Sequence, residues 1–181
     1  MTYQVRRYGD PALRRKAVPV ETVDDAVRQL AQDMLQAMYR ENGIGLAAEQ
    51  VGRREALCVI HVPPSEEGEE PAPASGGDAV PMPWVLVNPE ITAMRGEQTG
   101  QEGCLSFPEI FIPIRRAEEI TVSYTGLDSR RQTARVSGLL ARAVQHEVDH
   151  LNAVLLVDRM SAVQKVAVAG KLKRLKRSAR G

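Results

Sequence analysis

Residues 138–151 read GLLARAVQHEVDHL. At about 100° per residue, the leucine, alanine and valine side chains of this segment gather on one half of a helix surface, which predicts a helix with a buried face. His146 and His150 lie four residues apart, within about 40° of each other at the edge of that apolar arc. Glu147 falls inside the arc, where an unpaired carboxylate is costly to bury, so we expect this acid to have a function. Arg142 and Asp149 are expected on the opposite, more polar side.

Two histidines at this spacing can converge on one metal ion, and the H-E-x-x-H pattern is typical of metal-dependent hydrolases. A catalytic metal commonly takes three protein ligands and keeps an open position. The chain has no glutamate after Glu147 and no histidine after His150, so the third ligand is expected upstream. The candidates are Cys104, His61 or one of the acids.

The two cysteines of the chain differ in their surroundings, and two are too few for a disulfide scaffold. Cys104 lies in residues 101–108, a glycine-containing turn followed by a proline-rich stretch, where irregular backbone can position a ligand. Cys58 alternates with apolar residues in a predicted strand, which is typical of inert core cysteines. His61, at the end of that strand, is expected to be a partly exposed structural histidine.

Composition places the chain in a broad class. The 181 residues predict a single domain over 1–181, and 43% hydrophobic residues are enough for a hydrophobic core. The formal net charge of +1 gives no reason to treat the whole domain as a nucleic-acid binder. Neither a signal peptide nor a run of about 18 apolar residues is visible, so we expect a cytoplasmic protein without a membrane or DNA partner.

The order of predicted elements indicates an α+β fold with mostly antiparallel pairing. A proline- and glycine-rich stretch at 63–83 is expected to be a flexible surface loop within the domain. The other predicted elements are a helix over Asp24–Glu41, strands over Ala56–Val62, Trp84–Val87, Glu119–Tyr124 and Gln132–Val136, a helix from about Gly138 to Asn152, and a basic C-terminal helix within 161–181.

Three segments resemble the peptide deformylase family, metalloenzymes that remove the formyl group from the N-terminal methionine of new polypeptides. They are Gly43–Gln50, Glu102–Ser106 and Gln145–Leu151, and they occur in the same order as in that family. Weaker similarity extends from Gly9 to Met160. The resemblance implies an α+β fold in which antiparallel sheets wrap around the helix that carries the histidine pair.

The same resemblance implies a role for individual residues. It makes Cys104, His146 and His150 the metal ligands and Glu147 the general acid and base. It assigns the oxyanion donors to the Gln50 side chain and the Leu105 backbone N–H, substrate binding to Gly43, Ile44, Gly45 and Gly103, and a bracing ion pair to Arg116 and Asp149.

One sulfur and two nitrogen ligands suit Fe(II), Zn(II), Co(II) or Ni(II), and the resemblance implies Fe(II) as the physiological metal. It also implies N-formylmethionyl nascent peptides as partners. Four residues depart from the family pattern. Glu49 replaces a common proline, Ala153 a frequent glycine and Leu156 a frequent phenylalanine, and Phe111 lies where some members carry a polar or basic residue.

The chain has no acid after Asp158 but eight basic residues. This charge is typical of a solvated end helix, and it also fits contact with ribosomal RNA, which the resemblance makes sensible. Two other functions remain open at this stage. One is a zinc endopeptidase of the H-E-x-x-H type, and the other is a non-catalytic module that binds metal or RNA.

Overall fold

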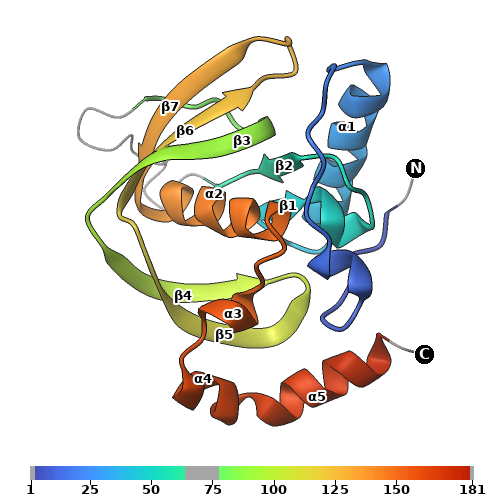
Figure 1. Cartoon of the computed structure of the whole chain (residues 1–181), viewed down its shortest axis with the longest axis vertical. Helices are drawn as coiled ribbons and strands as arrows, with labels where there is room; N and C mark the ends of the chain where they lie inside the picture. Colours follow the sequence, from blue (N-terminus) through green and yellow to red (C-terminus); the bar gives the residue numbers. More distant parts are fainter. Residues whose placement is uncertain (1–2, 64–77, 180–181) are drawn as a thin grey trace.

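The computed structural model describes residues 3–63 and 78–179, and Figure 1 shows helix α2 between two β-sheets. The elements, in chain order, are η1 (Pro11–Arg14), α1 (Asp25–Arg40), β1 (Gly45–Ala47), η2 (Ala48–Val51), β2 (Leu57–Ile60), β3 (Trp84–Arg95), β4 (Gln98–Cys104), β5 (Phe107–Arg116), β6 (Glu119–Thr125), β7 (Arg131–Ser137), α2 (Gly138–Leu151), α3 (Leu156–Arg159), α4 (Ala162–Ala167) and α5 (Ala169–Ser178).

Both sheets are antiparallel, so the predicted mixed α+β class is confirmed. The larger sheet has five strands in the order β1-β2-β3-β6-β7, and β1 lies at one edge. The smaller sheet is the hairpin of β4 and β5, in which Cys104 pairs with Phe107. No helix within 3–63 and 78–179 is long and apolar enough to cross a bilayer.

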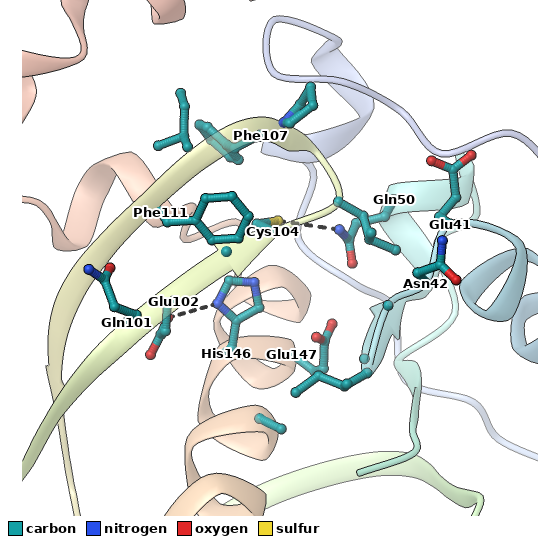
Figure 2. A pocket seen from close by; sticks show the side chains of 18 of the residues that line it. Glu41, Asn42, Gln50, Gln101, Glu102, Cys104, Phe107, Phe111, His146 and Glu147 are labelled. Carbon is teal, nitrogen blue, oxygen red and sulfur yellow. Dashed lines mark hydrogen bonds and ion pairs between the residues drawn. The ribbon is translucent and has the colours of Figure 1, made fainter. Parts of the chain in front are cut away.

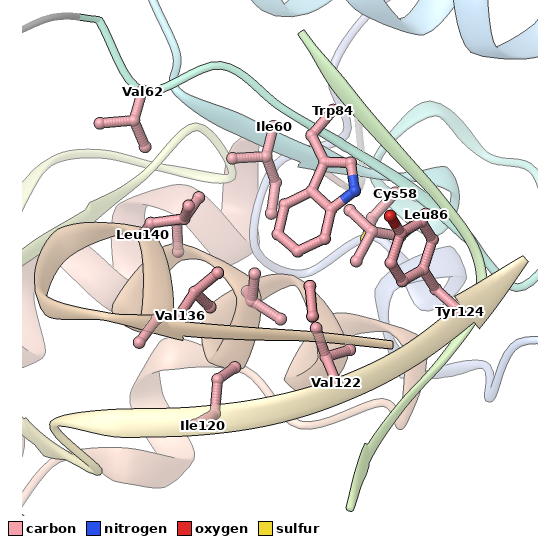
Figure 3. Close-up of a cluster of buried hydrophobic side chains, with 14 of the residues drawn as sticks. Cys58, Ile60, Val62, Trp84, Leu86, Ile120, Val122, Tyr124, Val136 and Leu140 are labelled. Atoms are coloured by element: carbon pink, nitrogen blue, oxygen red, sulfur yellow. The ribbon is translucent and has the colours of Figure 1, made fainter. Parts of the chain in front are cut away.

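The first core lies between α2 and the five-stranded sheet (Figure 3). Strand β6 buries every second residue, so Ile120 and Val122 point to the same face. Leu140 and Val144 of α2 pack against that face, which places the inner side of the helix where its sequence pattern predicts. This packing anchors α2 on the larger sheet.

A second core joins α1 to the larger sheet. Met34 and Met38 of α1 are fully buried against Leu57 and Val59 of β2. The Asp24 carboxylate accepts a hydrogen bond of 2.9 Å from the Val27 N–H and caps the helix at its start. The predicted start and end of this helix are therefore close to the observed ones.

The third core lies outside the β4–β5 hairpin. Ile110, Ile112 and Ile114 of β5 alternate with exposed residues and pack against a cluster from the C-terminal part of the chain. Its members are Leu155, Leu156, Val157, Met160 and the partly buried Val168, Leu172 and Leu175.

The structure corrects two predictions about secondary structure. Residues 101–108 were expected to be a glycine-containing turn followed by a proline-rich stretch; the turn is present at Leu105 and Ser106, but it joins two strands, β4 and β5, that were not predicted. Strand β5 tolerates Pro108 and Pro113 because it pairs with β4 alone. The C-terminal segment was expected to be one helix, but it forms α4 and α5, which meet at Val168, where φ is −107° and ψ is 7°. Residues 64–77 of the predicted 63–83 loop, and residues 180–181 of the tail, lie outside the described residues.

Glu49 is an unusual buried acid in η2, directly before Gln50. Its side chain is 0% exposed, and neither carboxylate oxygen has a hydrogen-bond partner among the described residues. Burial raises the pKa of Glu49 to about 8, and the negative charges of Glu147 and Glu55 act in the same direction. The folded protein therefore holds a proton here that the unfolded chain releases near its ordinary pKa of 4.5.

This difference makes stability depend on pH. The unfolded state binds fewer protons than the folded state between pH 4.5 and about 8, so the contribution of Glu49 to the unfolding free energy falls across that range. We expect Glu49→Gln to become progressively more stable than the parent as pH rises, by at most about 5 kcal/mol above pH 8. Urea denaturation between pH 5 and about 9, at a fixed metal concentration, measures the difference.

Glu55→Gln is the matched control, because Glu55 is paired with Arg53 and its pKa is lowered. It should show no such gain at high pH. Parallel stability curves for Glu49→Gln and the parent would contradict the assignment.

Candidate metal centre and active site

Cys104 and the histidine pair come from opposite sides of the gap between the hairpin and α2. The Cys104 sulfur and one ring nitrogen from each of His146 and His150 all lie within 4.8 Å of one another. The Cys104 Sγ lies 3.3 Å from His150 Nε2, and the two imidazole rings are 5.0 Å apart between centroids. This donor set matches the one that soft or borderline divalent cations prefer.

The protonation of the two imidazoles fits a cation between them and the sulfur. Burial and the neighbouring His146 lower the pKa of His150 well below its ordinary value, which keeps the imidazole in the neutral form that binds metals. Burial opposes the charged form of His146, but its contacts with Cys104 and Glu102 outweigh burial and raise its pKa. His150 Nδ1 is buried without a hydrogen-bond partner among the described residues.

Of the upstream candidates that the residue pattern left open, Cys104 alone joins the histidine pair among the described residues. His61 lies at the end of β2, where its Nδ1 is 2.6 Å from the Tyr39 hydroxyl. Cys58 is fully buried in the first core, as expected for a structural cysteine. Burial also raises the pKa of the Cys58 thiol well above its usual value, so it is held as an unreactive thiol.

Glu147 points into the same gap (Figure 2). It is 3% exposed, and its Oε2 has no hydrogen-bond partner among the described residues. Burial raises the pKa of Glu147 to about 7, and the positive charge of His146 only partly offsets this effect. An acid with this pKa can both accept and release a proton near neutral pH.

Gln50 is held in one orientation by hydrogen bonds at both ends of its amide. Its Oε1 accepts a 2.9 Å hydrogen bond from the Ala47 N–H, and its Nε2 donates to the Ser106 hydroxyl at 3.1 Å. The same Nε2 lies 3.6 Å from the Cys104 sulfur. The donor end of the amide therefore faces the candidate metal centre, as Figure 2 shows.

A cavity of about 440 Å³ contains the predicted substrate and catalytic residues. Its walls come from β1 and the segment before it, from the hairpin, and from α2. Phe111, 69% exposed, lies at its rim over Gly103. The predicted site residues that line the cavity are Gly43, Ile44, Gly45, Gln50, Gly103, Cys104, Leu105, His146 and Glu147.

At three of these positions an added Cβ would come within 3.0 Å of a neighbouring side chain, which would have to move. A Cβ added to Gly43 would lie 2.7 Å from Leu105 Cδ1, and one on Gly45 would lie 2.3 Å from Glu147 Oε1. A Cβ on Gly103 would lie 2.7 Å from the Phe111 ring. Because glycine has no Cβ, the backbone at these three positions can lie close to Leu105, Glu147 and Phe111.

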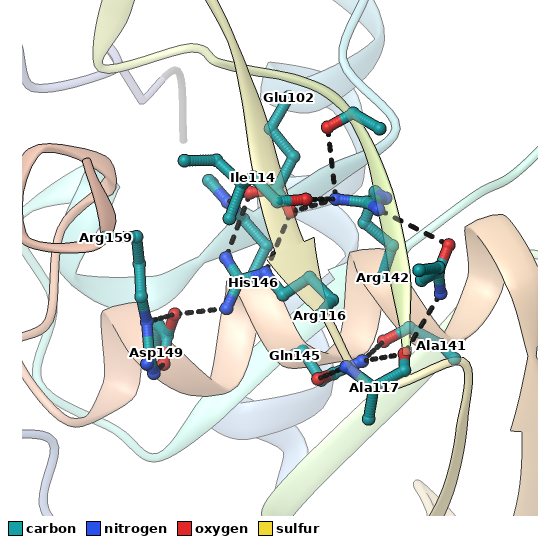
Figure 4. A network of polar contacts seen from close by, with 12 residues as sticks. Glu102, Ile114, Arg116, Ala117, Ala141, Arg142, Gln145, His146, Asp149 and Arg159 are labelled. Carbon is teal, nitrogen blue, oxygen red and sulfur yellow. Dashed lines mark hydrogen bonds and ion pairs between the residues drawn. The ribbon is translucent and has the colours of Figure 1, made fainter. Parts of the chain in front are cut away.

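The predicted contact between Arg116 and Asp149 is present, with Arg116 Nη1 2.5 Å from Asp149 Oδ2. It belongs to a larger polar network that the residue pattern did not predict (Figure 4). Glu102 is the centre of this network, because it contacts Arg116, Arg142 and the Nδ1 of His146. Burial opposes the ionisation of Glu102, but Arg116 and His146 hold its pKa well below the usual value.

The position of Arg142 is a correction. It was expected on the more polar side of the helix, and it is there, but that side is buried and Arg142 is only 5% exposed. The hairpin covers that side of α2, so the guanidinium is buried against the carboxylate of Glu102. The available signal was Glu102 itself, an acid two residues before the candidate cysteine ligand.

Comparison with known proteins shows which family the chain is similar to. The family model described as Polypeptide deformylase matches residues 2–166. The peptide deformylase of Dictyoglomus thermophilum is 45% identical over 159 residues, which cover 88% of this chain and 93% of that protein. The protein of the same name from Nitrosococcus oceani is 42% identical over 173 residues, with 96% and 95% covered.

Two solved structures have the same fold. Peptide deformylase from Ehrlichia chaffeensis superposes with a TM-score of 0.87 at 31% identity, covering 98% of each chain. The enzyme from Synechococcus elongatus, solved in complex with actinonin, gives a TM-score of 0.80 at 41% identity and covers 93% of this chain and 87% of its own. With a family match along nearly its whole length and relatives above 40% identity, the chain belongs to the polypeptide deformylase family.

Proposed function

We propose that this protein is a metal-dependent hydrolase that removes the formyl group from N-formylmethionyl peptides and releases formate. The observation that carries the proposal is the meeting of the Cys104 sulfur and two imidazoles within 4.8 Å, in a cavity that also holds the buried acid Glu147. The family match over residues 2–166 supports one catalytic domain spanning the chain. The proposed substrates are made in the cytoplasm, which is therefore the proposed location.

Cys104, His146 and His150 would hold one divalent cation. We propose Fe(II), with Zn(II), Ni(II) and Co(II) as possible substitutes, because thiolate and imidazole ligands suit all four. A cation bound there supplies a Lewis acid for a water molecule and for the substrate carbonyl oxygen.

Glu147 and the two hydrogen-bond donors perform the remaining chemistry. Glu147 accepts a proton from the attacking water and later passes it to the leaving amine, which frees the α-amino group of methionine. The Gln50 amide and the Leu105 N–H donate to the formyl oxygen as negative charge develops on it. One donor of this kind typically contributes about 3–4 kcal/mol to transition-state stabilisation.

The peptide would bind along the free edge of β1. This strand pairs with β2 on one side only, so an extended peptide can add to it as a further strand. Gly43, Ile44 and Gly45 provide the backbone for this pairing, and Gly103 forms the opposite wall. The Ile44 side chain is 38% exposed and available to contact the methionine.

We expect Glu147→Gln to lose at least about 100-fold in formate release, because an amide of the same size cannot accept the proton. The assay uses anaerobically prepared, iron-loaded protein and formyl-Met-Ala-Ser, with acetylated and unformylated peptides in parallel. Metal content should be unchanged, and Glu97→Gln, a change at an exposed acid outside the cavity, should behave like the parent. Near-normal turnover by Glu147→Gln would refute its role.

The same assay distinguishes the two alternative functions. Cleavage of internal peptide bonds would favour the endopeptidase, and no hydrolysis by the parent would favour a binding module.

Gly45→Ala tests the close approach of β1 to Glu147. The added methyl group would lie 2.3 Å from Glu147 Oε1, so the carboxylate must move away from the position where it meets water. We expect activity to fall by at least about tenfold while metal content is retained. Gly170→Ala is the matched control, because a Cβ there meets nothing within 4 Å. Full activity of Gly45→Ala would contradict the proposed placement of Glu147.

We propose a further contact of the basic helix α5 with ribosomal RNA. Leu172 and Leu175 of α5 face the third core, and Lys171 Nζ donates to the Glu109 carbonyl at 2.7 Å, so the helix is held on the hairpin. Lys173, Arg174 and Arg177 are exposed on its outer side and carry no acid beside them in sequence.

Replacing Lys173, Arg174 and Arg177 together by glutamine should weaken ribosome binding and flatten its salt dependence by about three ions. Hydrolysis of formyl-Met-Ala-Ser should not change. A control variant with Arg15, Lys16 and Arg130 replaced by glutamine loses the same number of positive charges outside α5. It distinguishes an effect of α5 itself from an effect of the net charge of the protein. Unchanged affinity of the α5 variant, measured by ribosome co-sedimentation at several salt concentrations, would rule out this contact.

A further inference from the structure

The three ligand residues of the candidate metal centre come from two different parts of the fold. Cys104 ends β4 in the two-stranded sheet, whereas the histidines lie on α2, which packs on the five-stranded sheet. Within the described residues, no strand pairing connects the two sheets. Two short links, residues 96–97 and 117–118, join the hairpin to β3 and β6. The distance between the sulfur and the imidazoles therefore depends on these links and on the side chains that cross from α2 to the hairpin.

Among the described residues of α2, Arg142 makes the most hydrogen bonds to the hairpin. It lies four residues before His146 on α2, so both side chains lie on the side of the helix that the hairpin covers. Its Nη1 donates to Glu102 Oε1 at 2.8 Å and to the Ile114 carbonyl at 2.9 Å. The same nitrogen contacts the Gly100 carbonyl at 3.3 Å, and Nη2 reaches Gln98 Oε1 at 3.4 Å. One guanidinium thus contacts both strands of the hairpin (Figure 4).

The hairpin is shaped to receive this guanidinium. A Cβ on Gly100 would lie 3.2 Å from Arg142 Nη2 and 3.3 Å from its Cζ. Because four hydrogen-bond contacts hold the guanidinium, it has little freedom to move away from an added methyl group. Glycine at this position of β4 allows the strand to lie directly against the guanidinium.

Arg116 has a different part in the network. It comes from β5, and its Nε and Nη2 contact the two oxygens of Glu102 at 2.8 and 2.9 Å. Glu102 therefore remains paired with Arg116 when Arg142 is replaced. The loss of Arg142 removes a connection between α2 and the hairpin without leaving a lone buried carboxylate.

We propose that Arg142 is a positioning residue that holds β4 against α2 and so sets the placement of Cys104 relative to His146 and His150. It acts through Glu102 and through the backbone of both hairpin strands, and it does not contact the metal. The inference rests on the metal centre proposed above.

The test compares Co(II)-loaded forms of Arg142→Met, Arg142→Lys and the parent. Two quantities are measured: the rate at which a chelator removes cobalt, and the thiolate-to-cobalt charge-transfer absorption. We expect Arg142→Met to release cobalt about tenfold faster, with a weaker or shifted absorption band. Arg142→Lys should recover part of the difference, because a single ammonium group lacks the planar fork that contacts both strands and Glu102.

Arg159→Met is the matched control. Arg159 binds Asp149 at the far end of the same network, with Nη2 2.5 Å from Asp149 Oδ1, and within the described residues it forms no hydrogen bond or ion pair with Glu102. Its cobalt release should stay within about twofold of the parent. A folded Arg142→Met that matches the parent in release and absorption would overturn the proposal, as would equal acceleration by Arg159→Met.

Gly100→Ala keeps the proposal testable if Arg142→Met fails to fold. The added methyl should displace the guanidinium and speed cobalt release, and the double variant Gly100→Ala with Arg142→Lys should lose less than the two single effects combined. No effect of Gly100→Ala, or fully additive effects, would count against the proposal. Failure of the proposed function is seen separately, as a parent protein that binds no cobalt or releases no formate.

Discussion

The shared carboxylate of Glu102 is the contact on which the candidate active site depends. Buried ions are costly to remove from water, and they are tolerated where every charge finds partners with good geometry. Here Arg116, Arg142 and His146 occupy the two oxygens of Glu102. The three residues that pair with Glu102 therefore hold the hairpin, α2 and the His146 side chain in fixed positions relative to one another.

Three buried glutamates show how the surroundings determine protonation in one small fold. Glu102 has cationic partners, which keep its pKa low, whereas Glu147 has an unpaired oxygen and a pKa raised to about 7. Glu49 lacks partners for both oxygens, and burial raises its pKa to about 8. The same side chain thus provides a permanent charge, a group that exchanges protons near neutral pH, and a largely neutral acid.

Three glycines shape the cavity together with the residues that we assign to catalysis. Gly43, Gly45 and Gly103 each bring backbone to within a distance at which a Cβ would collide with Leu105, Glu147 or Phe111. Backbone that approaches this closely can hydrogen-bond to an extended peptide, and it confines the peptide beside the candidate metal centre. Exposed Phe111 at the rim is a departure from the polar residues expected in part of the family.

The sequence by itself determined the features that depend on local pattern. Helical periodicity and the Asp24 cap predicted α1, and the apolar arc of α2 predicted that His146 and His150 converge beside a buried Glu147. Residue pattern alone left Cys104, His61 and the acids as alternative third ligands, and only the resemblance favoured Cys104. The tertiary structure decided which of them meets the histidines, because the hairpin brings β4 across α2 over a separation of more than 40 residues.

Long-range packing also explains what the pattern did not predict. The hairpin was not predicted because its proline-rich stretch is not typical of a strand. Proline is tolerated in β5 because this strand pairs with β4 alone and its other edge is free. The burial of Arg142 was not predicted, because periodicity reports the polarity of a helix face and not what covers it. A charged face can be buried when another element provides partners for every charge, and those partners are distant in sequence.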